Sequence, residues 1–157
     1  MEIKEALSKA IKKATSKQSL KKYGNQVVDD IKRRTRLGFG VKEHGGKRYS
    51  LSSKPLSAAY LKFRKKHKKL LHGETSPTKH NLTFTGQLLN AMKAEVKSRT
   101  IEVNFHNRRP PKPSNAEIAG YVSKDRPFLN MSDRELQRLI KEIENVLTKA
   151  FEKNFKG

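Results

Sequence analysis

Residues 126–136 constrain the fold of this chain most, because they contain a helix start and lead into the longest helical pattern of the sequence. Ser132 stands where an N-cap residue is expected and Glu135 follows three positions later, so each side chain can bond the free backbone N–H of the other residue. Nine apolar residues then recur at steps of three and four, along one side of a helix predicted over residues 132–155: Leu136, Leu139, Ile140, Ile143, Val146, Leu147, Ala150, Phe151 and Phe155.

The residues just ahead of this helix predict how the chain enters it. Pro127 disfavours a helical conformation for Arg126, so this part of the chain is expected to be extended. Phe128 and Leu129 then lie directly before the cap. We expect these two side chains to anchor the fold by seating the helix against a β-hairpin that is predicted below, and Arg126 to point outward to a neighbouring subunit.

Length and composition favour one small domain. The 157 residues suffice for a single domain with its own core, which we predict over residues 1–157. Only 34% of the residues are hydrophobic and the mean hydropathy is −0.85. A core this lean predicts either long polar extensions or additional burial by assembly with other subunits.

The net charge of +21 predicts attraction to polyanions or to an acidic protein surface. Residues 1–80 hold 22 basic and 6 acidic side chains, whereas residues 81–157 hold 14 and 9. The chain has no cysteine, so it has no disulfide framework, thiol nucleophile or thiolate metal site. Its start lacks the apolar run of a signal peptide, and no stretch approaches the about 18 apolar residues of a membrane span. We therefore expect a soluble protein.

Helical patterns dominate the N-terminal part. Residues 2–14 predict a short basic amphipathic helix within an N-terminal extension over residues 1–18, ahead of a core over residues 19–131. A second helix is predicted over about residues 19–35, ending in the cations Arg33, Arg34 and Arg36, and residues 37–54 are predicted to form a loop with short extended pieces.

A third, very basic helix is predicted after Pro55, which suits a first helical turn. Its apolar stripe opposes a cationic face made of Lys62, Arg64, Lys65, Lys66, Lys68 and Lys69. Thr85 is a candidate cap for a short helix that carries Leu88, Leu89 and Met92.

The hydrophobic period then changes from helical to alternating. Ile101, Val103 and Phe105 alternate with polar residues after a turn-like stretch at residues 97–100, which predicts a β-hairpin. The predicted fold class is therefore α+β, with a small antiparallel sheet or hairpin packed with a long C-terminal helix and N-terminal helices.

A proline-rich basic arm follows the hairpin. It contains Pro110, Pro111 and Pro113 among three cations, Arg108, Arg109 and Lys112. Prolines remove backbone donors and stiffen a segment toward polyproline II, so we predict an extended arm with an interaction role. Residues 116–122 are predicted to form a helical turn, with residues 123–125 turning the chain back.

The order of these parts resembles the neck, or tail-completion, proteins of tailed bacteriophages. The resemblance spans about residues 20–155 and rests on Thr85-Gly86-Gln87-Leu88 and Arg126-Pro127-Phe128-Leu129, in that order and at that separation. A helix ending in cations and a hairpin, placed as in that family, accompany the two tetrapeptides.

The resemblance implies a non-enzymatic virion protein, assembled in the host cytoplasm. Such a protein forms a ring of identical subunits between the head connector and the tail, around the DNA channel. The expected partners are other copies of the chain, connector or head-completion proteins, tail proteins and packaged DNA held by non-specific electrostatics. Candidate contacts to the DNA channel or to a partner are cationic: Arg33, Arg34, Arg36, Lys65, Lys66, Lys68, Lys69, Arg108, Arg109 and Lys112.

Two alternatives stay open at this point. The charge alone also fits a basic module that binds nucleic acid without sequence specificity, and the cations near residues 62–69 also fit a solvated helix face. His80-Asn81 and His106-Asn107 superficially suggest a small nuclease, but the sequence lacks the metal-ligand spacing that such a site needs. We predict no catalytic residue, no metal site and no cofactor, and we expect Tyr23, Phe63, Phe105 and Phe151 to pack in cores rather than to stack on bases.

Overall fold

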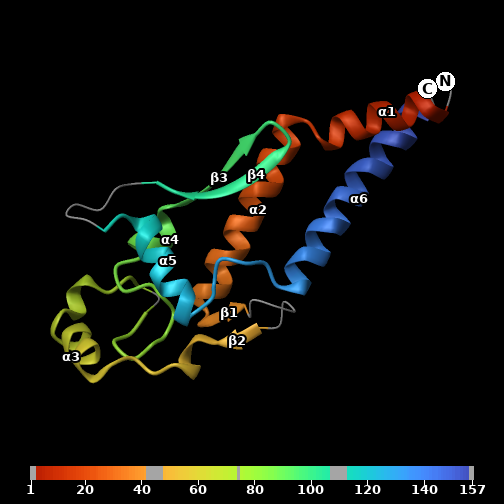
Figure 1. Cartoon of the computed structure of the whole chain (residues 1–157). Coiled ribbons are helices and arrows are strands. Elements are labelled where there is room, and N and C mark those ends of the chain that lie inside the picture. Colours follow the sequence, from red (N-terminus) through yellow and green to blue (C-terminus); the bar gives the residue numbers. More distant parts are fainter. Residues whose placement is uncertain (1–2, 42–47, 74, 107–112, 156–157) are drawn as a thin grey trace.

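Helix α2 (Lys17–Arg36) runs through the middle of the molecule and organises the fold, as the computed structural model of the chain shows (Figure 1). The structure describes residues 3–41, 48–73, 75–106 and 113–155. Ser16 caps α2 by accepting a hydrogen bond from the Ser19 backbone N–H at 3.2 Å. The helix buries eight of its 20 residues, which explains why the remaining elements pack around it.

A β-hairpin lies directly on α2. Strands β3 (Met92–Lys97) and β4 (Thr100–Phe105) are antiparallel, with Met92 opposite Phe105 and Lys97 opposite Thr100. Gly24 permits the close approach, because a Cβ at this position would lie 2.8 Å from the side chains of Ala94 and Ile101. The predicted hairpin is confirmed, and so is the α+β fold class.

A second small sheet follows α2. Gly38, with φ of +90°, ends the helix and leads into β1 (Phe39–Val41), which pairs antiparallel with β2 (Arg48–Ser50). The Val41 backbone N–H donates to Pro127 O at 2.8 Å, so this sheet contacts the segment that precedes the last helix. The short extended pieces predicted in the loop are these two strands.

The basic third helix is shorter than its sequence pattern. A single 3-10 turn, η1 (Leu51–Ser53), precedes α3 (Ala58–Lys66), and a second, η2 (Lys68–Leu70), follows it. Pro55 lies before the helix rather than in its first turn, because Ser57 is the cap and accepts from the Tyr60 backbone N–H at 3.2 Å. A short helix, α4 (Gln87–Asn90), precedes β3, so Met92 belongs to the hairpin.

Helix α5 (Asn115–Asp125) is longer than predicted. A capping box formed by Ser114 and Glu117 starts it, and residues 123–125, expected to turn the chain, are still helical. The Ser-x-x-Glu spacing is present in the sequence and is the signal that could have predicted the full helix.

The hydrophobic core lies between α2, α4, β3 and α5. We call these elements, together with β4 and the β1–β2 sheet, the body. The buried side chains of the core are those of Val28, Ile31, Leu89, Met92, Ala119 and Phe128. Phe128 is fully buried and Leu129 packs against the same cluster, so the predicted fold anchor is confirmed for both residues. Tyr23 is buried and Phe105 packs against the core, as expected.

The last helix, α6 (Asp133–Phe155), begins at the predicted capping box. The Glu135 backbone N–H donates to Ser132 Oγ at 3.4 Å, and the Ser132 backbone N–H donates to Glu135 Oε2 at 2.8 Å. From this start α6 runs away from the body and lies beside α1 (Ile3–Ala14), so that the first turn of α1 and the last turn of α6 are neighbours (Figure 1). We call these two helices the α1–α6 pair.

The α1–α6 pair meets through small side chains. Ala6, Ala10 and Ala14 are buried on α1, and Ala150 is buried on α6. Of the nine apolar residues in the predicted stripe of α6, only Ala150 is buried, and the helix packs mainly on α1 rather than on the hairpin. The expected seating against the hairpin is therefore wrong. None of the described helices is both long and apolar enough to cross a membrane.

Candidate functional site

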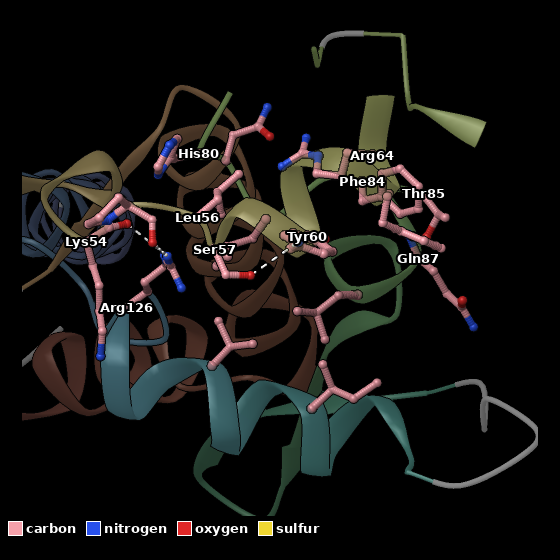
Figure 2. A pocket seen from close by; sticks show the side chains of 18 residues that line it. Lys54, Leu56, Ser57, Tyr60, Arg64, His80, Phe84, Thr85, Gln87 and Arg126 are labelled. Carbon is pink, nitrogen blue, oxygen red and sulfur yellow. Dashed lines mark hydrogen bonds between the residues drawn. The ribbon is translucent and has the colours of Figure 1, made fainter. Parts of the chain in front are cut away.

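A cavity of about 550 Å³ opens between α3, the loop ahead of α4, and α5 (Figure 2). The tetrapeptide Thr85-Gly86-Gln87-Leu88 forms part of its wall, and Arg126 stands at its edge. The first stretch on which the phage resemblance rests therefore borders this cavity in full, and the second borders it through Arg126 alone. Apolar side chains supply much of the remaining wall, and Ser57, His80 and Asn81 are among its polar members. The apolar ones include Leu56, Leu82, Ile118 and Val122.

Three aromatic rings form one side of this cavity. The cap at Ser57 starts α3 so that Tyr60 and Phe63 lie on the face turned toward Phe84. The Phe63 and Phe84 ring centroids are 5.5 Å apart, and those of Tyr60 and Phe63 are 6.3 Å apart. Tyr60 remains 40% exposed and Phe63 45% exposed. The expectation that Phe63 packs in a core is therefore wrong, because the two rings present apolar surface to solvent.

Arg64 holds the loop beneath these rings and is not part of an exposed cationic face. Its guanidinium is buried and donates to Ser76 O at 2.7 Å and to Lys79 O at 3.0 Å. Burial lowers the pKa of Arg64, while Tyr60 partly opposes this effect. The expectation that Arg64 belongs to the cationic face is wrong, because the loop supplies carbonyl groups that sequence spacing does not indicate.

Gly86 determines how the chain turns at the cavity wall. Its φ of +71° favours glycine, and a Cβ there would lie 2.5 Å from His72 Cδ2. Gly86 is the N-cap residue of α4, whereas the predicted cap, Thr85, accepts only a long hydrogen bond of 3.4 Å from the Gln87 backbone N–H.

Arg126 is turned inward along the chain rather than outward to a neighbour. Its Nη2 atom donates to Lys54 O at 2.9 Å and to Pro55 O at 3.3 Å, which ties the approach to α3 to the end of α5. Lys54 also pairs with Asp125, and this hydrogen bond lowers the pKa of the Asp125 carboxyl group. Arg126 is thus a fold anchor, and the expectation that it points toward another subunit is corrected.

Arg34 was expected to contact DNA or a partner. This expectation is wrong, because Arg34 is buried and cannot make such a contact in this structure. Its Nη1 atom pairs with Glu135, and its Nη2 atom donates to Phe128 O at 2.6 Å and to Asn130 O at 2.7 Å. Glu135 is also buried. One guanidinium thus joins the end of α2 to the cap of α6. Sequence reasoning missed this role because the partners are far away along the chain.

Two other candidate cations, Arg33 and Arg36, lie in a hollow at the end of α2, together with Lys32 and Lys79, which sequence reasoning missed. Lys32, Arg33 and Arg36 line a space of about 630 Å³ together with Lys79 and Asp29. Burial lowers the pKa of Lys32, and the neighbouring Arg36 and Lys93 lower it further, while Asp29 opposes them. Arg33 is exposed and pairs with Asp30 at 2.9 Å. We call this group the α2 basic hollow; an anion bound there would relieve the repulsion between its cations.

The remaining candidate cations lie elsewhere. Lys65, Lys66, Lys68 and Lys69 are exposed at the end of α3 and on η2, and the structure does not bring them into the α2 basic hollow. Arg108, Arg109 and Lys112 of the proline-rich arm lie outside the described residues. The candidate contacts therefore occupy at least two separate surfaces.

The histidine–asparagine pair at residues 80–81 has a structural explanation. Asn81 is buried, where its amide donates to Arg36 O at 3.2 Å and its Oδ1 atom accepts from Thr75 Oγ1 at 2.8 Å. His106 pairs with Glu95 at 2.7 Å on the hairpin. Within the ranges that the structure describes, no group of three or more His, Asp or Glu residues could hold a metal ion.

Comparison with known proteins returned no match: no protein-family model, no curated protein and no solved structure is similar to this chain.

Proposed function

We propose that this chain is a structural virion protein of a tailed bacteriophage. In this proposal it is one of the neck, or tail-completion, proteins that join the head connector to the tail around the DNA channel, without catalytic activity. It would be assembled as a ring of identical subunits in the host cytoplasm. The observation that carries the proposal is the meeting of the two tetrapeptides in one core cluster, which contains Phe128 and against which Leu88 and Leu129 pack.

The packing of Leu88 against the cluster that contains Phe128 fits a reading of the two tetrapeptides as parts of one structural unit. The kinds of side chain exposed on the surface also fit a protein that binds partners on several sides. The chain presents aromatic rings at the cavity and cations in the α2 basic hollow and at the end of α3. DNA that passes through a ring of subunits would contact such cations through its phosphates, without sequence-specific binding.

The proposal is tested by joining. Purified protein is mixed with DNA-filled heads that carry a connector but no neck protein, and with free tails, and the joined particles are counted by negative-stain electron microscopy. We expect joined particles to depend on the added protein. A protein that binds neither heads nor tails, in conditions where both are intact, would overturn the proposal.

A variant at the cavity sharpens this test. Phe63→Ser changes a ring that is 45% exposed, and Leu70→Ser is a matched control because Leu70 is 55% exposed on η2. If the cavity receives a neighbouring virion protein, Phe63→Ser lowers the yield of joined particles while Leu70→Ser leaves it unchanged. If both variants give equal yields of joined particles, the cavity is not part of the surface that joins heads to tails.

The α2 basic hollow favours a second candidate, a module that binds nucleic acid without sequence specificity. That candidate predicts micromolar or tighter binding to free duplex DNA at physiological salt, with a steep salt dependence. Lys32→Ala combined with Arg36→Ala would lower the salt slope by about 2. Lys149→Ala with Lys153→Ala, on exposed positions of α6, makes the same change in charge and serves as control. Binding that vanishes by about 0.2 M salt would leave the neck proposal as the better account.

A further inference from the structure

The α1–α6 pair presents a large apolar surface that the described chain does not cover. On α1, Ile3, Leu7 and Ile11 are 64%, 49% and 48% exposed. On α6, Leu136, Ile140 and Phe155 are 44%, 38% and 48% exposed. The alanines of α1 occupy the contact with α6, so the larger side chains next to them on α1 face outward. Singly exposed apolar residues are ordinary, whereas two adjoining stripes are not.

The two helices contribute to one continuous surface. Ile11 of α1 and Leu139, Ile143 and Leu147 of α6 line a hollow of about 240 Å³, and the side chains around it are apolar apart from Thr15 and the Tyr23 hydroxyl. The hollow continues onto the body at Leu20, Tyr23 and Ile101. An approaching helix could therefore place apolar side chains against both members of the pair.

The exposed area is large enough for a specific contact. With roughly 100 Å² from each of the six residues above, the surface is on the order of 600 Å², close to the roughly 800 Å² that each partner buries in a standard protein interface. The partly buried residues Ile143, Val146, Leu147 and Phe151 would extend it. The area lies at the upper end of the about 300–600 Å² of the largest apolar patch on a typical monomer, and such patches are often functional.

Charge distinguishes a second copy from other occupants. The chain carries +21, and α2 alone holds seven basic and two acidic residues. Helix α6, in contrast, holds five of each, and α1 holds four basic residues and one acidic residue, so the pair carries +3 of the chain's +21. A second copy that approaches along the pair therefore avoids most of the repulsion between two highly basic molecules. An acidic partner would instead be drawn to the cationic surfaces of the body.

We propose that the α1–α6 pair is the surface through which one copy of this chain binds another. Two such pairs, packed on their apolar faces, bring four amphipathic helices together and supply the core that one pair lacks. Because the contact joins the same surface of two copies, it closes a dimer, and it is therefore additional to the contacts that would form the proposed ring. The contact itself follows from exposure, area and charge.

Sedimentation velocity of the full chain over a range of concentrations tests the contact. The measurement is made at about 0.5 M salt, where the Debye length is about 4 Å and the general repulsion is screened. We expect reversible self-association. Leu7→Asp and Ile140→Asp, both at exposed positions, should each raise the dissociation constant about tenfold or more, because each places an unpaired charge in the contact.

Leu70→Asp is the matched control, because Leu70 is 55% exposed on η2, outside the pair. It should self-associate like the unaltered chain, and all three variants should keep their circular dichroism spectra. A chain that stays monomeric to sub-millimolar concentration would overturn the inference, as would self-association that Leu7→Asp and Ile140→Asp leave unchanged. A monomer that binds phosphatidylglycerol vesicles through Leu7 would also overturn it, in favour of a membrane surface.

The outcomes separate this inference from the proposed function. If the chain self-associates through Leu7 and Ile140 but does not join heads to tails, the result would support the proposed contact and contradict the proposed neck function. If the Leu7→Asp variant joins heads to tails as well as the unaltered chain does and forms the same oligomers, the result would support the neck function and contradict the proposed contact.

Discussion

Helices α2 and α6 have similar lengths and similarly clear apolar stripes, yet the chain covers them very differently. α2 buries eight of its 20 residues, whereas α6 buries two of its 23, Glu135 and Ala150. The hairpin and the other elements of the body surround α2, while α6 leaves the body after its first turns (Figure 1). An amphipathic pattern therefore identifies the face that needs a partner, but not whether the same chain supplies that partner.

The largest expected effect tests the connection between the two regions. Arg34→Ala should lower the free energy of unfolding by about 3–5 kcal/mol, because it leaves the buried Glu135 carboxylate unpaired. Urea denaturation measures the loss. Arg33→Ala removes the neighbouring, exposed cation and should change stability by no more than about 0.5 kcal/mol. Equal effects of the two substitutions would contradict the buried role of Arg34.

The two regions should also respond differently to loss of an aromatic ring. Phe128 is fully buried in the body, so Phe128→Ala should cost roughly 3 kcal/mol. Phe155 is 48% exposed at the end of the pair, and Phe155→Ala should cost less than about 0.5 kcal/mol in dilute protein. Thermal unfolding compares them. An unchanged midpoint for Phe128→Ala would show that Phe128 is not a core residue in solution.

Two helical glycines should give changes of opposite sign. Gly24→Ala forces a Cβ to within 2.8 Å of the hairpin side chains, and we expect a loss of about 1–3 kcal/mol from overpacking. Gly120 lies in α5, where an added Cβ would meet no atom of the other described elements within 4 Å, so Gly120→Ala should stabilise the chain by up to about 1 kcal/mol. Chemical denaturation of both variants tests whether α2 lies as close to the hairpin as the structure has it.

The smallest expected effect concerns pH. The hydrogen bond from Lys54 lowers the pKa of Asp125, so the pair stabilises the folded state above the ordinary carboxyl pKa and loses this contribution as pH falls through the lowered value. Lys54→Met should return the Asp125 pKa toward its ordinary value in an NMR titration. Because both groups are exposed, the accompanying change in urea midpoint should be small. An unchanged Asp125 pKa would contradict the pair.

Local patterns predicted the secondary structure well where the signal is local. The capping box at Ser132, the hairpin and the glycine that ends α2 were all visible in spacing and residue type. The same reasoning ended α5 too early, at residue 122. It also placed the start of the third helix too early, because Pro55 and Ser57 are both suitable near a helix start. Element boundaries depend on packing as well as on local propensity.

The candidate site was predicted only in part. The positive charge of the sequence indicated that cations of α2 are candidate contacts. It did not indicate which of these cations are exposed. Arg34 and Arg64 are buried because distant carbonyl groups and Glu135 satisfy them, whereas Lys32, Arg33 and Arg36 remain at the surface hollow. No spacing in the sequence indicates a contact between such distant residues. The aromatic side of the cavity was missed for the same reason, since Phe63 fits a stripe and only the fold leaves it exposed.

By itself, the sequence determined the helical and alternating segments, the helix start at Ser132, the absence of cysteine chemistry and the strongly basic charge, because these depend on residue type and short spacing. Only the tertiary structure decided that the two tetrapeptides meet in one core cluster, that Arg34 and Arg126 act inside the fold, and that the apolar stripe of α6 stays largely uncovered. Burial depends on which distant segments meet, and that is a property of the whole chain.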